Sequence, residues 1–575
     1  MAKSELSGAA FLKTEIARGR LQSIVDEAGS VLIHTAFSMG IREAKDFSCA
    51  VLTPDGRTVT QSHQSIPMFI GTLTHTVQAL LEVFPPAQWR LGDVMATNDP
   101  WLGTGHLFDL TLVKPVFTTS GHLIGFASVV AHLSDIGGRG FGLDSKDIFE
   151  EGFQIPPIKI VDAGSPNVMF RHLLASNVRL SDQVLGDVDA MLSTLGVIEH
   201  RLGALAEELS DAALLHIYAD LDHRAEAYMR EAIGRLPSGS YQSVFESEPI
   251  MGTSFVIKLV IRVHGETLEV DFDGSSKQVP AAINACYSYS CAYVVYAMKC
   301  LLAPDVPFTA GLTRPIRVVA PEGTIVNSRF PAGGVARNLV GQFIPGMIFG
   351  ALAKVAPSLA ECGAPRPTCR IIGAGSSAGM NFSVPFFVMG GLGARPNKDG
   401  IACLAFPTNT ETVPVEIIET SSPLFVEQKE LVADSGGAGQ FRGGLGQRIV
   451  IRCLAEVAQA FVVAQRLHKP PRGSRSGMDG SVAKVAVRGL PVMNLSGSTV
   501  LHRGDTISLQ SPGGGGFGSP KKRRPNLVAS DIRNGYVTKA MARIQYGWDP
   551  KTDLRIIPVT NSNAPTKPRR RRRQN

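Results

Sequence analysis

The chain has 575 residues, of which 44% are hydrophobic and 59 are glycine, so it is long enough for roughly two to four packed regions rather than one core. Its formal net charge is +7, but nine positive charges lie in two basic runs, residues 521–524 and 569–573. Subtracting those nine leaves the rest of the chain at −2, which argues against a broad surface for nucleic-acid phosphates.

Residues 1–180 are predicted to form an N-terminal α/β region. The apolar spacing from Glu5 to about Thr35 predicts a helix. A strand, a turn and a second strand follow, because Pro-Asp-Gly at residues 54–56 has turn chemistry between DFSCAVL and RTVTQ. A helix from about Thr72 to Phe84 should stop at the double proline that follows it. Extended segments and glycine turns continue to about residue 160.

Four further regions follow along the chain. Residues 181–240 are predicted to form two helices, with Ser210 as the N-cap of the second. The apolar face of that second helix is expected in the core and comprises Leu214, Ile217, Leu221, Ala225 and Tyr228. Residues 241–413 are predicted to form a central α/β region with a hairpin near 254–276 and a helix from about Tyr293 to Leu302.

The C-terminal part is rich in glycine. In residues 414–520, short strands divided by the clusters SGGAGQFRGGLGQ and SPGGGGFGSP predict a mostly antiparallel β-rich region. Residues 521–575 are predicted to be a basic linker, a short helix and a disordered Arg-rich tail. The fold class is therefore expected to be mixed α+β, with the N-terminal α/β region, a central helical segment and a C-terminal antiparallel region.

Metal-type ligands are densest between Asn98 and Asp135. His106 and Asp109 are three residues apart, as are His132 and Asp135, and glycines flank both pairs. A lone histidine in such a pair is more often a satisfied buried residue than a ligand, but two pairs within thirty residues favour a site. Nitrogen and oxygen ligands suit Zn²⁺, Mn²⁺ or Fe²⁺ better than Ca²⁺ or Mg²⁺.

Other chemistry has weaker support in the sequence. Asp46 begins the DFSCAVL segment and is either a ligand or a residue that caps the strand entry. The glycine clusters lack the lysine and hydroxyl of GxxxxGK[ST], so ATP is not expected to bind this chain. There is no GxSxG motif and no CxxC pair among the eight cysteines, which leaves a metal-activated water as the better-supported nucleophile.

Several segments distributed over nearly the whole chain carry a resemblance to a known family, and they include GDVMATNDPWLGTGHLFDLTLVKPVF, AHLSDIGG, FQIPPIKI, VDFDGSS, TRPIRVVAPEGTIVN, DSGGAGQFRGGLGQ and SPGGGGFGSP. With these segments in this order, the chain resembles the hydantoinase B family. The family includes N-methylhydantoinase and caprolactamase subunits, the C-terminal half of 5-oxoprolinase, and one subunit of acetone and acetophenone carboxylases. The resemblance implies metal ligands at Asp46, His106, Asp109 and His132.

The resemblance also implies a partner and a reaction. The partner is a hydantoinase A-type subunit with an actin-like ATPase fold, which phosphorylates the carbonyl oxygen of a small cyclic amide. This chain is then the subunit of a hetero-oligomer that bears one divalent metal, zinc or manganese, and hydrolyses the activated ring, while ATP is used by the partner. The alternative is a subunit of an ATP-dependent ketone carboxylase. A binding or scaffolding subunit without catalysis is the third hypothesis.

Several residues receive weaker predictions. Asp135 and Asp99 are candidate catalytic residues that orient water or an imidazole. Asn284 and Arg337 lie in matching segments and are candidates for substrate binding, with buried structural roles equally expected. The sequence departs from the family at Leu133 and Phe69, which replace histidines that are common there, and at GTGH in place of GGTH.

The expected compartment is the cytoplasm. No charge-free apolar run of ~18 residues is present, and the charged N-terminus MAKSELSGAAFLKTEIARGR does not resemble a signal peptide. No membrane span and no specific nucleic-acid partner are therefore expected, and the arginine tail is interpreted as a solvated end.

Overall fold

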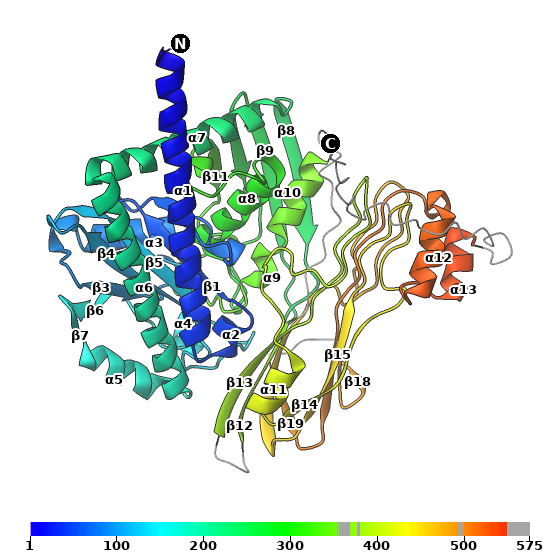
Figure 1. The fold of residues 1–575 in the computed structure, drawn as a ribbon. Helices are drawn as coiled ribbons and strands as arrows, with labels where there is room; N and C mark the ends of the chain where they lie inside the picture. The colour runs from blue at the N-terminus through cyan, green and yellow to red at the C-terminus, as the bar shows by residue number, and fades with distance from the viewer. Residues whose placement is uncertain (1, 354, 356–367, 376–379, 493–497, 549–575) are drawn as a thin grey trace, which may run out of the picture.

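The structure is a computed structural model that describes residues 2–353, 355, 368–375, 380–492 and 498–548. The described residues form four β-sheets with helices around them, so the mixed α+β class is confirmed (Figure 1). The short helices are α2 (Met39–Arg42), α4 (Ile148–Glu151), α5 (Val168–Asn177), α9 (Asn338–Gly341), α11 (Val415–Ser421), α12 (Pro525–Arg533) and α13 (Lys539–Met541).

A seven-stranded antiparallel sheet dominates the N-terminal region, in the order β2-β1-β5-β4-β3-β6-β7. Its strands are β1 (Phe47–Leu52), β2 (Thr58–Gln61), β3 (Val94–Thr97), β4 (Asp109–Phe117), β5 (Leu123–His132), β6 (Ile158–Asp162) and β7 (Ser165–Pro166). The expected strand-turn-strand at residues 47–61 is confirmed as the antiparallel pair β1–β2.

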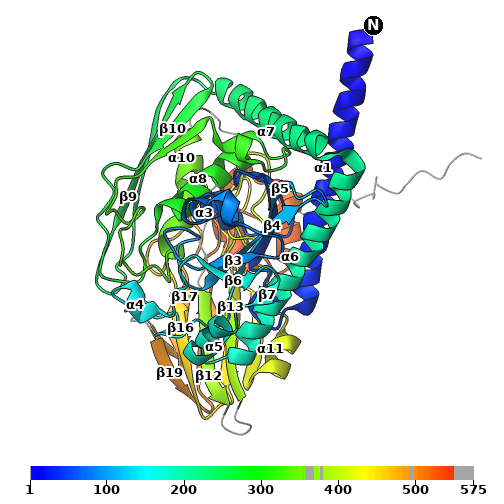
Figure 2. The ribbon, with the colours of Figure 1, turned by 90° about the vertical axis from the view of Figure 1, so that its left-hand side faces the viewer.

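Both faces of this sheet are buried, which explains its continuous apolar strands. Cys49 and Val51 of β1 belong to the large core shared with α1 (Ala2–Thr35) and α6 (Ser181–Leu209). Ala50 and Leu52 point the other way, into a smaller core with α3 (Thr72–Val83). The helices predicted over 5–35 and 72–84 are therefore confirmed, and they pack on opposite faces of one sheet. Figure 2 shows α1 and α6 along one side of the molecule.

The two helices predicted after residue 181 are confirmed as α6 and α7 (Asp211–Gly234). Ser210 caps α7, because its side-chain oxygen accepts a hydrogen bond from the backbone nitrogen of Ala213. The predicted apolar face of α7 is buried except at Tyr228, which is 41% exposed. The buried face of α7 continues through Met229 instead of Tyr228, because Met229 lies four positions after the buried Ala225.

A second sheet of four strands, in the order β11-β10-β9-β8, follows the helices. Its strands are β8 (Gly239–Glu246), β9 (Val256–His264), β10 (Thr267–Asp271) and β11 (Ile316–Val319). The predicted hairpin is the antiparallel pair β9–β10, and β11 adds in parallel to β10. Two helices accompany it, α8 (Tyr287–Leu302) and α10 (Ile344–Leu352); α8 begins six residues before the predicted position of Tyr293.

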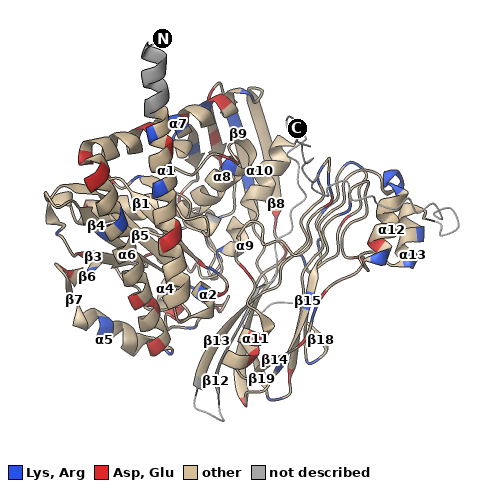
Figure 3. Cartoon of the chain, in the orientation of Figure 1, with Lys and Arg blue, Asp and Glu red and all other residues tan. Residues whose placement is uncertain are grey.

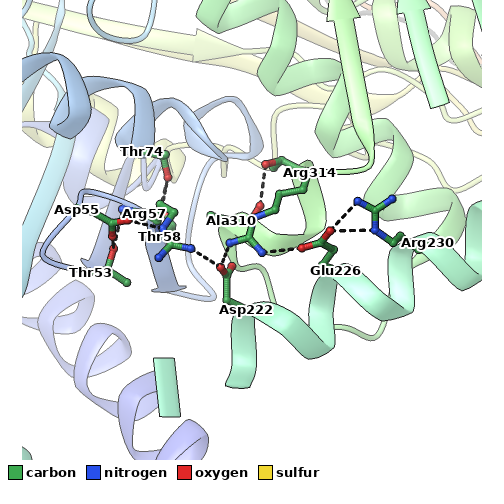
Figure 4. A network of polar contacts seen from close by, with 11 residues as sticks. Thr53, Asp55, Arg57, Thr58, Thr74, Asp222, Glu226, Arg230, Ala310 and Arg314 are labelled. Carbon is green, nitrogen blue, oxygen red and sulfur yellow. Dashed lines mark hydrogen bonds and ion pairs between the residues drawn. The ribbon is translucent and has the colours of Figure 1, made fainter. Parts of the chain in front are cut away.

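A network of ion pairs joins the β1–β2 hairpin to α7 and to the segment before β11 (Figure 4). Arg57 Nη1 lies 2.8 Å from Asp222 Oδ2, and Arg314 contacts the same carboxylate. Arg314 Nη1 also lies 2.6 Å from Glu226 Oε2. Segments more than 150 residues apart are thereby fixed against each other around the Asp222 carboxylate.

The C-terminal region contains two antiparallel sheets that pack face to face. The strands between residues 414 and 520 are antiparallel, as predicted, but one of the two sheets also includes β12 and β13, which precede residue 414. One has the order β13-β12-β16-β19 and the other the order β14-β15-β20-β17-β18. Their strands are β12 (Thr368–Gly375), β13 (Met380–Phe387), β14 (Leu424–Leu431), β15 (Gln447–Cys453), β16 (Val457–Val463), β17 (Lys484–Val487), β18 (Leu490–Pro491), β19 (Ser498–His502) and β20 (Thr506–Gln510). A shared apolar core that includes Val384, Ile451 and Leu509 lies between them.

The glycine clusters pack backbone against backbone. Gly437 N donates to Gly514 O (2.8 Å), and Gly514 N donates to Gly444 O (3.0 Å). A Cβ placed on Gly443 or Gly514 would overlap a neighbouring carbonyl. These segments therefore require glycine for the close approach of several extended chains, as at the crowded axis of a collagen-like assembly.

Arg523 belongs to the folded body although it lies in the basic run predicted as a linker. Its side chain is 1% exposed and pairs with Asp399 at 2.7 Å and Asp531 at 2.8 Å. Figure 3 shows residues of both charge signs on the outer helices α1, α6 and α7. The arginine tail at 569–573 lies outside the described residues. No helix in the described ranges is long and apolar enough to cross a membrane.

Candidate metal centre

The register of the seven-stranded sheet brings the predicted ligands together at the ends of neighbouring strands. Asp109, the first residue of β4, pairs directly with His132, the last residue of β5. On the other side of β5, the backbone nitrogen of His132 donates to Asp46 O at 3.0 Å, immediately before β1. His106 precedes Asp109 by three residues and is brought back over the edge by the loop at Gly105, whose φ is +100°. Residues far apart in sequence thus meet because strand ends align.

Three of these side chains form a tight buried cluster. His106 Nε2 lies 2.8 Å from Asp109 Oδ1, and His132 Nδ1 lies 2.9 Å from the same oxygen. Among the described residues, these three form the one group of His, Cys, Asp or Glu whose ligand atoms all lie within 4.8 Å of one another. Asp46 is outside that group but lines the same cavity.

The electrostatics of the cluster suit a cation. Burial would raise the pKa of the Asp109 carboxyl, but the adjacent His106 ring, the Arg337 charge and the hydrogen bond from His132 outweigh burial and hold that pKa well below its usual range. Burial lowers the pKa of His106, and the Arg337 charge adds to that effect. The carboxylate is therefore ionised and the imidazole neutral at pH 7, which are the protonation states that bind a metal.

The donor geometry also fits a metal. His106 Nε2 is buried and has no hydrogen bond of acceptable geometry within the described chain, although Asp109 Oδ1 is close to it. Its other ring nitrogen, Nδ1, lies 3.3 Å from Val335 O, which fixes the ring. A ring held from behind with its second nitrogen unsatisfied beside a carboxylate has the arrangement of a metal ligand.

Arg337 supports Asp109 from the opposite side. Its Nη2 lies 2.8 Å from Asp109 Oδ2, and its Nε donates to Thr104 O at 2.7 Å. The guanidinium lies over the ring of Tyr289, 4.3 Å from the centroid. Thr104 Oγ1 donates to Asp109 Oδ2 at 2.5 Å, so both oxygens of the carboxylate are engaged. The substrate-binding role predicted for Arg337 remains a prediction; the residue does line the cavity.

Three other predicted site residues do not line this cavity. Asp135 accepts from the backbone of Gly137 and pairs with Arg179 at 3.0 Å. Asp99 accepts from Trp101 N and from the Gln154 side chain. The Asn284 amide bonds the backbone of residues 279, 281 and 333. These contacts shape the surrounding loops, and the direct roles given to Asp135, Asp99 and Asn284 stay predictions.

The cavity beside the cluster has a volume of about 100 Å³. It is lined by residues of widely separated segments, namely Asp46, Met68, His106, Asp109, His132, Phe141, Tyr289, 335–338, Gln342, Pro385, Phe387, Thr408, Thr410, Phe461 and Val463. The sequence predictions did not include its far wall, which comes from β13 and β16, because no local motif marks these apolar strand residues.

The departures at Phe69 and Leu133 lie in the apolar cores and not in the cavity lining. Phe69 is fully buried in the α3 core, with Leu73 and Phe126 in the same cluster. Leu133 is fully buried in the main core, and its backbone nitrogen donates to Phe108 O. Neither residue lines the cavity.

Glu151 is a buried residue near the site that no sequence pattern marked in advance. Its Oε1 accepts from Gly334 N at 2.7 Å and from Val335 N at 3.0 Å. It therefore holds the segment whose Val335 carbonyl contacts His106. Burial raises the pKa of the Glu151 carboxyl to about 7, against opposing hydrogen bonds from that backbone.

Comparisons with known proteins find similarity along almost the entire chain. A family model described as Hydantoinase B/oxoprolinase matches residues 11–520. The putative B component of a D-/L-hydantoinase from a Pseudomonas species is 30% identical, over 93% of this chain and 94% of that protein. The beta subunit of the caprolactamase from Pseudomonas jessenii is 27% identical, over 92% and 95%. The 5-oxoprolinase of Dictyostelium discoideum is 28% identical over 87% of this chain, which spans 39% of that longer protein.

Solved structures show the same fold. The crystal structure of an ATP-dependent caprolactamase from Pseudomonas jessenii superposes with a TM-score of 0.86 and 25% identity, covering 94% of this chain and 97% of that one. A nucleotide-free acetone carboxylase superposes with a TM-score of 0.84 and 19% identity, covering 94% and 80%. At that lower identity, the second similarity shows the fold alone.

Proposed function

Because this chain belongs to the Hydantoinase B/oxoprolinase family, we propose that it is the metal-bearing subunit of an ATP-dependent enzyme that hydrolyses a cyclic amide. The observation that carries the proposal is the buried cluster of His106, Asp109 and His132 beside a cavity. Relatives named as a hydantoinase, a 5-oxoprolinase and a caprolactamase all have names that refer to cyclic amides.

The proposed metal is zinc or manganese, held by His106, Asp109 and His132 with Asp46 beside them. Imidazole nitrogens and carboxylate oxygens are ligands that both ions accept. When bound, such an ion polarises a substrate oxygen and lowers the pKa of a water molecule toward about 7. Arg337 and Thr104 orient the Asp109 carboxylate, and Val335 O orients the His106 ring.

The proposed partner is an ATPase subunit of the hydantoinase A type. An unstrained amide is a poor electrophile, and transfer of a phosphoryl group from ATP to its carbonyl oxygen creates a leaving group. Ring opening consumes one water, and release of phosphate consumes a second, so one ADP and one phosphate form for each ring opened. Two relatives are named as one subunit of a larger enzyme, which supports a separate partner. So does the absence of GxxxxGK[ST] from this sequence.

The test is ring opening by this chain co-purified with its ATPase-type subunit. Lactams, hydantoins and 5-oxoproline would be supplied with ATP, with and without bicarbonate, and ADP and ring-opened product would be measured together. We expect ATP-dependent product without bicarbonate, at one ADP per ring, and none from either subunit alone. Turnover that requires bicarbonate and a ketone would contradict the proposal and indicate a carboxylase.

A further inference from the structure

The cavity has one wall with metal-type ligands and one apolar wall. His106, Asp109 and His132 line it from the seven-stranded sheet. The opposite wall comes from the C-terminal sheet, where Phe387 ends β13 and Phe461 lies in β16. Phe461 is 5% exposed. The described residues of β13 and β16 that line this wall are all uncharged.

Apart from the proposed metal, which faces the reacting amide, the described lining of the cavity offers no cation for a carboxylate elsewhere on the substrate ring. Within the described chain, Arg337 is the only lysine or arginine among the lining residues. It already pairs with Asp109 and donates to Thr104 O. Asp46 adds a further carboxylate. A buried charge without a partner is strongly disfavoured, so a carboxylate against the apolar wall would weaken binding.

Two carboxamide side chains supply polarity of another kind. Asn338 and Gln342 lie four residues apart at α9 and both line the cavity. Gln342 is 7% exposed and lines the cavity. A primary carboxamide at the wall of a cavity offers a ligand both a donor and an acceptor.

Building on the function proposed above, we infer that the substrate is a cyclic amide without charged substituents, whose amide edge binds Gln342 and whose apolar ring atoms pack against Phe387 and Phe461. In a small ring the amide is cis, so its N–H and C=O point to the same edge. A primary carboxamide presents a donor and an acceptor side by side and matches that edge with two hydrogen bonds. After phosphorylation of the carbonyl oxygen, the Gln342 amide still donates to the ring nitrogen.

The substrate test uses rings that differ only in charge. The metal-loaded complex with its ATPase subunit is assayed with γ-butyrolactam, its methyl derivative, and 5-oxoproline, which is the same ring with a carboxylate. Hydantoin, its methyl derivative and its acetate derivative form a second series. We expect kcat/KM for the carboxylate-bearing ring to be lower by on the order of a hundredfold in each series. Equal or better turnover of 5-oxoproline would overturn the inference and leave the proposed function standing.

The residue test uses Gln342→Leu, with Gln428→Leu as a matched control outside the cavity. Leucine keeps the volume and removes both hydrogen bonds, so we expect KM to rise about tenfold with kcat and metal content little changed. Phe387→Arg places a cation on the apolar wall. It should reduce the ratio of kcat/KM for γ-butyrolactam to kcat/KM for 5-oxoproline about tenfold. Unchanged KM in Gln342→Leu would overturn the role of that residue. Failure of the wild-type complex to open any of these rings would overturn the proposed function, and the inference with it.

Discussion

Replacing Glu151 tests how the backbone segment behind His106 is held in place. Glu151 is 1% exposed, and its Oε1 is the acceptor for Gly334 N and Val335 N. Glu151→Ala leaves two buried N–H groups without a partner, at about 1–3 kcal/mol each, so we expect the free energy of unfolding to fall by about 2–6 kcal/mol. Glu151→Gln retains an oxygen acceptor and removes the ionisation, which makes it the informative comparison.

The same residue predicts a pH dependence with a definite sign. Burial raises the pKa of the Glu151 carboxyl from 4.5 to about 7, so the folded chain binds this proton more tightly than the unfolded chain. The resulting stabilisation is complete below pH 4.5 and is lost as the pH rises through 7. At about 1.4 kcal/mol per pH unit, the wild type should lose about 2–3 kcal/mol relative to Glu151→Gln between about pH 5 and pH 8.

The assay is urea unfolding of wild type, Glu151→Gln and Glu151→Ala at both pH values in the presence of a chelator. Differences between wild type and Glu151→Gln cancel the titration of all other groups. We expect Glu151→Gln to match wild-type stability at the lower pH, where the carboxyl is neutral, and to exceed it by about 2–3 kcal/mol at the higher pH, where wild type carries a buried carboxylate. A difference that is the same at both pH values would refute the account of a carboxyl with a raised pKa.

Three further predictions concern the support of the site and the C-terminal region. Gly514→Ala should destabilise the glycine-rich region by at least about 3 kcal/mol in a thermal melt, because the added Cβ overlaps a carbonyl and several backbone hydrogen bonds must break. Gly196→Ala is the control: this glycine of α6 has open space around it, so the change should stabilise the chain by up to about 1 kcal/mol in the same melt. Thr104→Val removes the hydrogen bond to Asp109 and should weaken metal binding about 10–100-fold in a competitive chelator titration; unchanged affinity would show that this contact does not orient the ligand. Arg523→Met should cost about 3–5 kcal/mol in urea unfolding, since it removes the cation shared by Asp399 and Asp531 and leaves Asp531 only the longer contact with Arg442, at 3.5 Å.

Local patterns predicted the helices and hairpins because their signals lie within a few residues. Ser210 was identifiable as a cap by its chemistry, and Pro54 to Gly56 marked the β1–β2 turn. The prediction that Tyr228 is buried on α7 was wrong because helical spacing alone allows either Tyr228 or Met229 on the buried face. Tertiary packing decides between them.

The convergence of the ligands depended on strand register, which the sequence does not specify. Two HxxD segments predicted a cluster, but the structure separates them: Asp109 joins both histidines, while Asp135 turns away to Arg179. That difference follows from position, since Asp109 begins β4 opposite His132, whereas Asp135 lies beyond the end of β5.

The far wall of the cavity and the glycine-rich packing were beyond local prediction. Phe387 and Phe461 belong to strands that pair only through β12, with no motif to mark them as lining residues. The glycine clusters indicated turns between strands, but they are extended segments packed against one another. In both cases the deciding contacts join residues far apart in sequence.

The central claim is that His106, Asp109 and His132 hold a catalytic metal. It is tested most directly by elemental analysis of the complex with its ATPase subunit, for wild type, His106→Ala and the control His34→Ala, which changes an exposed histidine of α1. The account predicts near-stoichiometric zinc or manganese in wild type and control, and loss of both metal and ATP-dependent ring opening in His106→Ala. Absence of metal from active wild type, or unaltered turnover by His106→Ala, would contradict it.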